Sequence, residues 1–209
     1  KEEFVSGIPL PVTDSGIGPD GAFYFAIGGR SIQSALYRVT YVGKESTAPV
    51  DGRDTKFAKE RELRKSLEAF HGKQDPKAVD AALSQLEHDD RHIRFAARIA
   101  LEHQPVEQWQ DKALSLKQPR ALITAVIGLA RQGKPGPEGG TSALQPRLLK
   151  TLSDLDFEHL NESLQIDWLR ALALTFIRQG KPDDETAVAF GKRIAPLYPA
   201  KSDALNREL

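Results

Sequence analysis

A pentapeptide that occurs twice constrains the fold of this chain more than any other feature. Arg-Gln-Gly-Lys-Pro spans residues 131–135 and recurs at 178–182, 47 residues later. Both copies follow an apolar segment, and in the same frame Ile127 aligns with Leu174. Each copy therefore predicts an apolar helix that ends in a basic turn, a glycine C-cap and a proline. A period of about 40–47 residues built from helix pairs is typical of HEAT or armadillo-like solenoids.

Helical spacing of apolar residues continues over the whole C-terminal part of the chain. Residues 121–130 and 168–177 are apolar nearly all round, as expected of helices that neighbours cover on several sides. Trp109 and Trp168 are interpreted as core residues. The sequence predicts a mainly α fold, with a HEAT-like α-solenoid over 56–209; the alternative is an irregular helical bundle. The expected helices span 56–71, 75–88, 89–102, 105–116, 119–132, 142–152, 161–179, 182–196 and 202–209.

Residues 1–43 have the period of β-strands instead. A β-rich run at 22–27 follows the turn residues Gly-Pro-Asp-Gly, Gly28 and Gly29 interrupt it, and an alternating run follows at 34–42. We expect a short antiparallel β segment here, either a hairpin or part of a four-stranded unit, and a polar linker at 44–55. An isolated hairpin is marginal in water, so this segment must pack on other parts of the chain, another chain or further strands.

The charge balance and two missing residue types exclude several classes of function. Lys and Arg total 29 and Asp and Glu total 29, so no overall basic field favours nucleic acid or an anionic membrane. No apolar run reaches the roughly 18 residues of a membrane span. Without cysteine there is no disulfide, thiolate metal site or covalent haem attachment in these residues. Without methionine, the chain is expected to be a processed product or an excised fragment.

Catalytic motifs are absent, so no catalytic, cofactor-binding or metal-binding residue is predicted. His88 and His92 stand four residues apart, a spacing that can share a metal on one helix. Asp89 or Asp90 resembles a helix start, however, so a solvated helix N-terminus is the preferred interpretation. The other polar candidates are interpreted as helix-end or surface residues: His71, His103, His159, Asp156, Glu158, Glu162 and Asp167. Asn161-Glu162-Ser163 matches a glycosylation sequon.

One part of the β segment is a candidate functional face. Arg30 follows Gly28-Gly29 at the end of a strand, where loop residues often carry function. Tyr37 lies on the next expected strand. The alternative for Arg30 is a structural hydrogen bond to loop carbonyls. Arg30 and Tyr37 are therefore the candidate site residues.

The β segment also resembles a known group of proteins. Residues 9–43 contain Gly-Pro-Asp-Gly-Ala-Phe-Tyr-Phe, which resembles the closing strands of β-propellers in the glucose/sorbosone dehydrogenase-like group. With the continuation through 63–109, the chain is similar to large multidomain proteins of planctomycetes. Those proteins are called membrane-bound dehydrogenases or haem-binding proteins. Arg30, in the Ile-Gly-Gly-Arg turn, is the one matched position on a propeller face.

This resemblance implies a role for the chain within a larger protein. Such proteins are expected to run from a propeller through HEAT repeats to a cytochrome c domain, and to be periplasmic or otherwise exported. The chain would hold the last propeller strands and the HEAT region, with haem c in a separate domain. It would be a non-catalytic spacer or docking region that contacts protein partners. The alternative is a stand-alone α-solenoid scaffold without a redox role; an enzyme acting within these residues is the third hypothesis.

Overall fold

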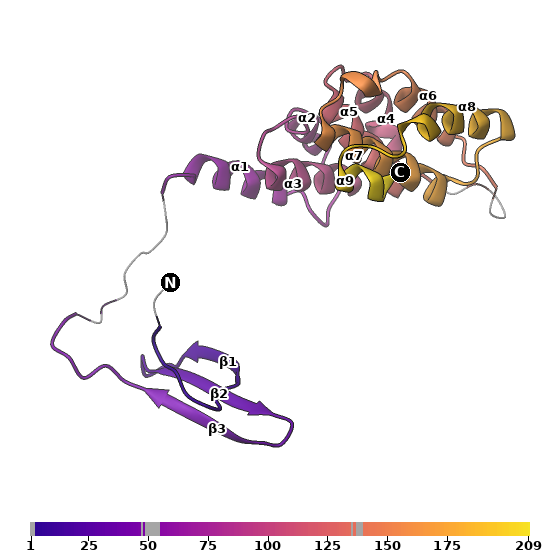
Figure 1. Cartoon of the computed structure of the whole chain (residues 1–209). Helices are drawn as coiled ribbons and strands as arrows, with labels where there is room; N and C mark the ends of the chain where they lie inside the picture. The colour runs from indigo at the N-terminus through magenta and orange to yellow at the C-terminus, as the bar shows by residue number, and fades with distance from the viewer. Residues whose placement is uncertain (1–2, 47, 49–54, 135, 137–139) are drawn as a thin grey trace. The chain divides into compact units, whose positions relative to one another are not determined.

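The computed structural model describes residues 3–46, 48, 55–134, 136 and 140–209 of the 209-residue chain. The chain divides into two compact units, Lys1–Arg53 and Asp54–Leu209, which are described separately (Figure 1). The first carries a small antiparallel sheet and the second is helical. The predicted mainly α fold with a short β segment is thus confirmed. Most of the predicted linker at 44–55 lies outside the described residues.

The sheet of the first unit is a three-stranded antiparallel meander. Its strands are β1 (Val12–Ile17), β2 (Phe23–Gly29) and β3 (Ile32–Val39), in the order β1-β2-β3. The Gly-Pro-Asp-Gly turn joins β1 to β2, with the amide of Gly21 bonded to the carbonyl of Gly18 at 2.9 Å. The structure therefore adds a strand before this turn, and β2 continues through both glycines that were expected to interrupt it.

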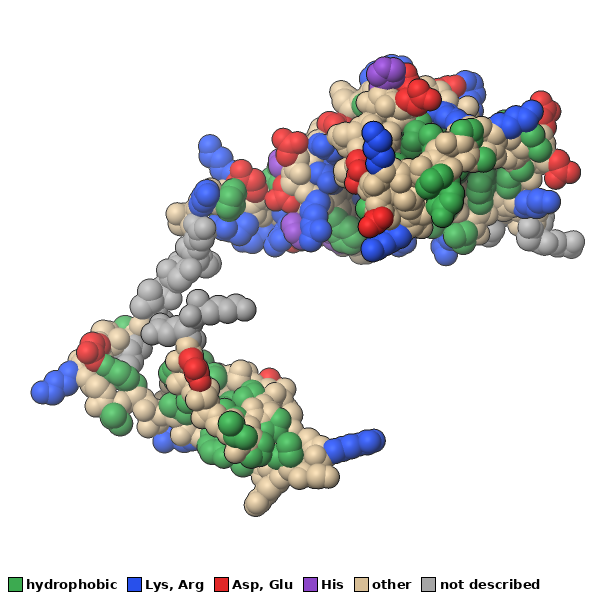
Figure 2. All heavy atoms as spheres, in the orientation of Figure 1, with side chains coloured by type: hydrophobic (Ala, Val, Ile, Leu, Met, Phe, Trp, Pro, Cys, Tyr) green, Lys and Arg blue, Asp and Glu red, His purple; other side chains and the backbone are tan. Residues whose placement is uncertain are grey.

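One face of the sheet is apolar and aromatic. Phe23, Phe25 and Ile27 alternate on β2, and register pairs Phe25 with Tyr37 on β3. The rings of Phe25 and Tyr37 stack at 4.9 Å, and Phe4 meets Phe23 edge-on at 5.9 Å. Figure 2 shows hydrophobic side chains gathered on this unit. A three-stranded sheet needs such a face to be stable, because isolated strand pairs are marginal.

In the second unit, alternate helices form one row in which each helix contacts the next. The row comprises α1 (Ala58–Glu68), α3 (Arg91–Glu102), α5 (Pro119–Gln132), α7 (Glu162–Gln179) and α9 (Asp203–Glu208). The other helices pack against this row: α2 (Pro76–Leu83) on α3, α4 (Gln110–Leu114) on α5, and both α6 (Gln145–Ser153) and α8 (Asp184–Ile194) on α7. Short 3-10 turns occur at Val106–Gln108, Phe157–His159 and Ala195–Leu197.

The core of this unit is built around two tryptophans. Trp109 and Trp168 are completely buried, which confirms their interpretation as core residues. Trp168 Nε1 donates to the carbonyl of Leu152 at 2.9 Å, so its polar atom is satisfied. Gly128 of α5 lies against Trp109, where an added Cβ would come within 3.2 Å of the ring. The absence of a side chain at Gly128 therefore lets α5 approach the indole closely.

Several helix boundaries differ from those predicted, and local capping explains them. The helix expected from residue 182 begins at Asp184, because the Asp183 carboxylate accepts the amide of Thr186 at 2.7 Å and acts as the N-cap. The helix expected over 105–116 is divided into a 3-10 turn and α4, since Trp109 between them has φ −132°. The predicted helix 75–88 ends at Leu83 and continues as turns.

The two pentapeptide copies adopt different structures. Gly180 has φ +99°, a conformation that favours glycine, whereas Gly133 has φ −57°. Gln132 is exposed, but its counterpart Gln179 is buried. Gly133 is required for another reason: a Cβ there would lie 2.8 Å from Gln179 Oε1. Both copies of the pentapeptide therefore end a helix, α5 or α7, but in different surroundings. Pro135 lies outside the described residues.

Candidate interaction surfaces

The helices α3, α5 and α7 share an arginine-rich side, which we call the arginine face. The carboxylate of Glu102 on α3 accepts from Nε of Arg131 on α5 at 3.0 Å through both oxygens. Arg178 on α7 donates to the carbonyl of Arg131 at 3.4 Å. These bonds place the ends of the three helices side by side. The arginine face comprises Arg91, Arg94, Arg98, Arg120, Arg131, Arg170 and Arg178. Arg91 is assigned to it by its helical spacing from Arg94 and Arg98 on α3.

At one end of the arginine face, a buried carboxylate joins two helices. The side chain of Glu102 is only 5% exposed and pairs with both Arg98 and Arg131. Burial lowers the pKa of Arg98 from its ordinary value, and Glu102 opposes that shift. Buried charges persist only when they are paired and hydrogen-bonded. Glu102 therefore fixes two guanidinium groups and fastens α3 to α5.

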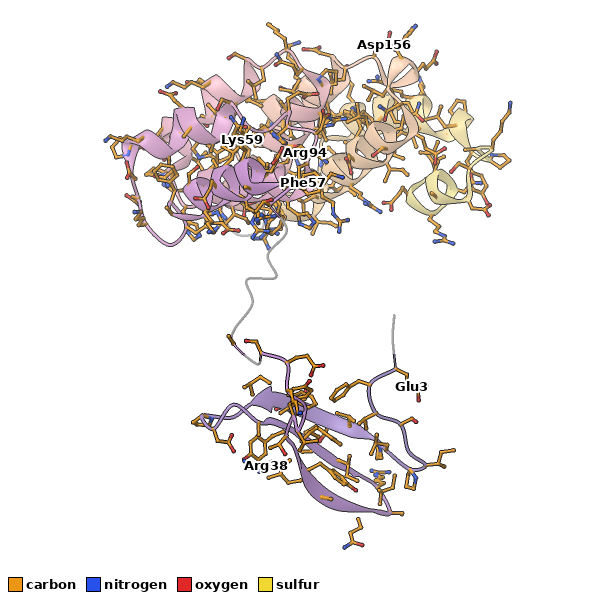
Figure 3. All side chains as sticks on the ribbon, turned by 90° about the vertical axis from the view of Figure 1, so that its left-hand side faces the viewer. Glu3, Arg38, Phe57, Lys59, Arg94 and Asp156 are labelled. Carbon is orange, nitrogen blue, oxygen red and sulfur yellow. The ribbon has the colours of Figure 1, made fainter. Side chains whose placement is uncertain are left out.

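At the other end, two arginines hold the loop before α3. Arg120 Nη1 contacts Asp89 Oδ1 at 3.2 Å and the carbonyl of Glu87 at 3.3 Å. Arg94 Nη1 donates to the carbonyls of His88 and Asp89 at 2.6 and 2.8 Å. These contacts are structural, because the guanidinium groups bind backbone carbonyls and the Asp89 carboxylate of one loop. Figure 3 labels Arg94 among the helices.

Asp167 of α7 lies close to this arginine-rich end. Burial raises its pKa, an effect that the neighbouring Arg170, Arg94 and Arg120 oppose. Arg170 in turn pairs with Glu208 of α9 at 2.7 Å, and that bond raises the pKa of Arg170. The charge network therefore extends from α3 to α9.

Apolar side chains are exposed between these charges. Phe95 on α3 is 57% exposed, and the guanidinium of Arg98 lies 5.2 Å from its ring centroid. Ile177 on α7 is 77% exposed. Aromatic residues and arginine are enriched where proteins contact each other. The arginine face thus combines the two side-chain types that favour protein contacts.

Positive charge exceeds negative charge on the arginine face. Among the described residues, five carboxylates interact with these seven arginines, namely Glu87, Asp89, Glu102, Asp167 and Glu208, so the arginines outnumber their partners by 7 − 5 = 2. The whole chain has a net charge of zero. Among the described residues, Arg91, Arg94 and Arg178 form no ion pair with a carboxylate. The arginine face is therefore locally basic within a neutral chain.

A cavity of about 820 Å³ adjoins the Glu102 end of the arginine face. It opens at the C-terminal ends of α3 and α5, and Glu102, His103, Lys134 and Arg147 contribute to its lining. The lining carries both signs of charge. It offers hydrogen-bonding groups without a convergent nucleophile and base, so it indicates a polar recess and no particular reaction.

The structure does not bring the two candidate residues of the β unit together. Arg30 is exposed in the turn between β2 and β3 and donates no hydrogen bond to a described residue. Tyr37 lies within β3 with its ring against Phe25. At about 3.3 Å per residue, the two positions are roughly 20 Å apart along the strand. A functional face at Arg30 and Tyr37 stays a prediction.

Another cluster on this sheet was not singled out in the sequence. Asp20 Oδ2 accepts from Arg38 Nη2 at 2.8 Å and from the hydroxyl of Tyr24 at 2.9 Å. The bond from Arg38, with further bonds from the Ala22 amide and Tyr24, holds the pKa of Asp20 below its ordinary value. The cluster ties the β1–β2 turn to β3, the strand that carries Arg38. The Pro-Asp-Gly turn and an arginine one strand away were its only sequence signals.

The histidines occupy separate places. Asp90 is the N-cap of α3, and its amide donates to Nδ1 of His88. His88 therefore precedes the helix that contains His92, so the two histidines do not share a helix. His71 Nε2 lies 2.9 Å from the carbonyl of Ala96, and the exposed His159 contacts Asp156 at 2.7 Å. Asn161 of the sequon caps α7 through its side-chain oxygen. In the part of the chain that is described, no three His, Cys, Asp or Glu residues are grouped to hold a metal.

No protein-family model, curated protein or solved structure matches this chain. Across the described ranges, no helix combines the length and apolar character needed to cross a bilayer.

Proposed function

We propose that the helical unit is a HEAT-like α-solenoid that acts as a non-catalytic spacer or docking region for proteins. The row α1, α3, α5, α7 and α9, with the other helices packed against it, supports this proposal. So does the pentapeptide repeat, whose copies end α5 and α7. In this arrangement the odd-numbered helix of each helix pair packs against the odd-numbered helix of the next pair, as expected for stacked repeats.

The arginine face is the observation that carries the docking role. No described element covers Phe95 or Ile177, which are more than half exposed beside Arg91 and Arg178. Exposed apolar groups next to guanidinium groups suit contact with another protein surface. The ion pairs of Glu102 hold this surface in a defined shape before a partner arrives, which lowers the entropic cost of binding.

The larger setting follows from the resemblance at residues 9–43. We propose from this resemblance that the chain belongs to a periplasmic or otherwise exported multidomain dehydrogenase that binds haem c in a separate domain. The antiparallel meander of β1, β2 and β3, with an apolar face, is compatible with the closing strands of a propeller. The docking partner would then be another domain of the same protein or a separate protein. A stand-alone α-solenoid scaffold is the alternative.

Site-specific photo-crosslinking in cells tests the docking role. A photoreactive phenylalanine analogue replaces Phe95 on the arginine face in one sample and the exposed Val188 of α8 in another. Discrete crosslinked species from either position support docking, and their absence from both overturns it.

The sequence of the parent gene tests the multidomain setting. A propeller before this chain and a Cys-x-x-Cys-His site after it are expected, and the lack of both favours the stand-alone scaffold.

A further inference from the structure

Two arginines of the arginine face are available to an incoming ligand. Arg91 and Arg178 are exposed and, among the described residues, neither pairs with a carboxylate; Arg178 donates only to a carbonyl at 3.4 Å. An exposed apolar side chain lies on the same helix near each: Phe95 one turn after Arg91 on α3, and Ile177 adjacent in sequence to Arg178 on α7, where it points to a different side of the helix. The arginine face therefore offers two exposed guanidinium groups on different helices, with an exposed apolar side chain elsewhere on the surface of each helix.

Helix geometry sets the span between these two arginines. The contacts of Arg131 with Glu102 and with Arg178 show that the ends of α3, α5 and α7 lie at the same level. Arg91 stands 11 residues before Glu102 on α3, so it lies about 16 Å from Arg178 in the direction of the helix axes. Two steps between packed helices add about 16–20 Å across the row. The diagonal is therefore about 25 Å, the length of roughly eight extended residues.

Resting on the proposed docking function, we infer that the arginine face binds an extended acidic segment of another protein. The segment would present a carboxylate and an apolar side chain at each end, about eight residues apart. Arginine forms bidentate pairs with carboxylates, and an exposed phenylalanine or isoleucine gains from covering its surface. The net excess of positive charge on the arginine face favours such a partner over a basic or neutral one.

A nucleic acid fits this surface less well than an acidic protein segment does. Glu102, Asp167 and Glu208 occupy several of the arginines, so this surface lacks the unbroken basic track that a continuous line of phosphates requires. Nucleic-acid surfaces are strongly basic, whereas the excess here is small. The apolar groups Phe95 and Ile177 also suit side chains better than a sugar–phosphate backbone.

Fluorescence anisotropy with the full chain tests this inference. The probe is a labelled peptide, Glu-Leu-Ser-Ser-Ser-Ser-Leu-Glu, at low salt; its matched controls are the peptide with Gln in place of Glu and oligothymidylate of eight nucleotides. The protein variants are R91E/R178E and, as a charge-matched control, K117E/K192E, which changes two exposed lysines outside the arginine face. If R91E/R178E changes the thermal unfolding midpoint, R91Q/R178Q replaces it in the binding assay, because glutamine removes the two positive charges without reversing them.

We expect saturable binding of the acidic peptide that weakens about tenfold or more in R91E/R178E and stays within about twofold in K117E/K192E. The Gln peptide should bind more weakly than the Glu peptide. Equal loss in both variants, or tighter binding of oligothymidylate than of the peptide, would overturn the inference. Crosslinks from position 188 with none from position 95 would also overturn it while leaving the docking function intact; crosslinks from neither would remove both.

Discussion

The side-chain amide of Gln179, at the end of α7, donates a hydrogen bond of 2.8 Å to the carbonyl of Ala130 near the end of α5. The same nitrogen contacts the carbonyl of Gly133 at 3.2 Å, and the amide oxygen accepts from the hydroxyl of Ser142. Gln104 makes a similar connection after α3, where it accepts the amide of Asp75 at 2.8 Å and donates to the carbonyl of Lys73 at 3.1 Å. Buried glutamines thus fasten neighbouring helix ends beside the arginine face.

Gln179→Ala should lower the free energy of unfolding by about 2–4 kcal/mol, because it leaves several buried polar groups without partners. The repeat provides its own control. Gln132→Ala removes the equivalent side chain from an exposed position and should change stability by less than about 0.5 kcal/mol. Urea unfolding of both variants measures the difference. Equal effects would contradict the fastening role of Gln179.

Gly133→Ala should destabilise the chain by about 1–3 kcal/mol, since the new Cβ would meet Gln179 at 2.8 Å. Gly191→Ala, in α8 where nothing lies within 4 Å, should instead stabilise it by about 0.5–1 kcal/mol. Thermal unfolding compares the two substitutions. A stabilised Gly133→Ala variant would show that the two helix ends are not closely packed.

Glu102→Ala should cost about 3–5 kcal/mol, because Arg98 stays buried without its counter-charge. The control is Asp111→Ala, which removes an exposed carboxylate paired with Arg147 at 2.6 Å and should cost less than about 1 kcal/mol. Chemical unfolding at low and high salt measures both losses of stability; salt should reduce the loss for the exposed pair of Asp111 more than the loss for the buried network of Glu102. A loss for Glu102→Ala no larger than that for Asp111→Ala would count against the buried network.

The raised pKa of Asp167 predicts a pH dependence of defined sign. A carboxyl whose pKa is higher in the folded state than in the unfolded state binds protons more tightly when folded, so its contribution weakens stability as pH rises from below the ordinary value of 3.8 through the raised pKa. The free energy of unfolding of the wild type should therefore fall, relative to that of Asp167→Asn, as the pH increases from below 3.8 through the raised pKa. Unfolding free energies at several pH values test this, and a relative gain by the wild type would be the contrary result.

Much of the helical unit could be predicted from local signals. The N-caps Asp75, Asp90 and Asn161 and the buried Trp109 and Trp168 lie where capping chemistry and apolar spacing indicate. The solenoid assignment stays a proposal. The identical residues Gln132 and Gln179 show the limit of such reasoning, since burial depends on which loop packs against each helix end.

The arginine face was not predicted, because it joins residues that are distant in sequence. Glu102 meets Arg131 across 29 residues, and no local pattern distinguishes this pair from the many exposed charges nearby. A net charge of zero argued against an electrostatic partner, yet the fold gathers seven arginines on one side of three helices. Only the packing of α3 on α5 and of α5 on α7 makes that asymmetry visible.

The yield of photo-crosslinking from position 95 in cells tests the central claim of docking through the arginine face most directly. It should be compared between the otherwise unchanged chain and the R91E/R178E background. A discrete crosslinked protein, joined through an acidic segment and lost in R91E/R178E, is the predicted result. The same crosslinked species at undiminished yield in both backgrounds, or none in either, would contradict it.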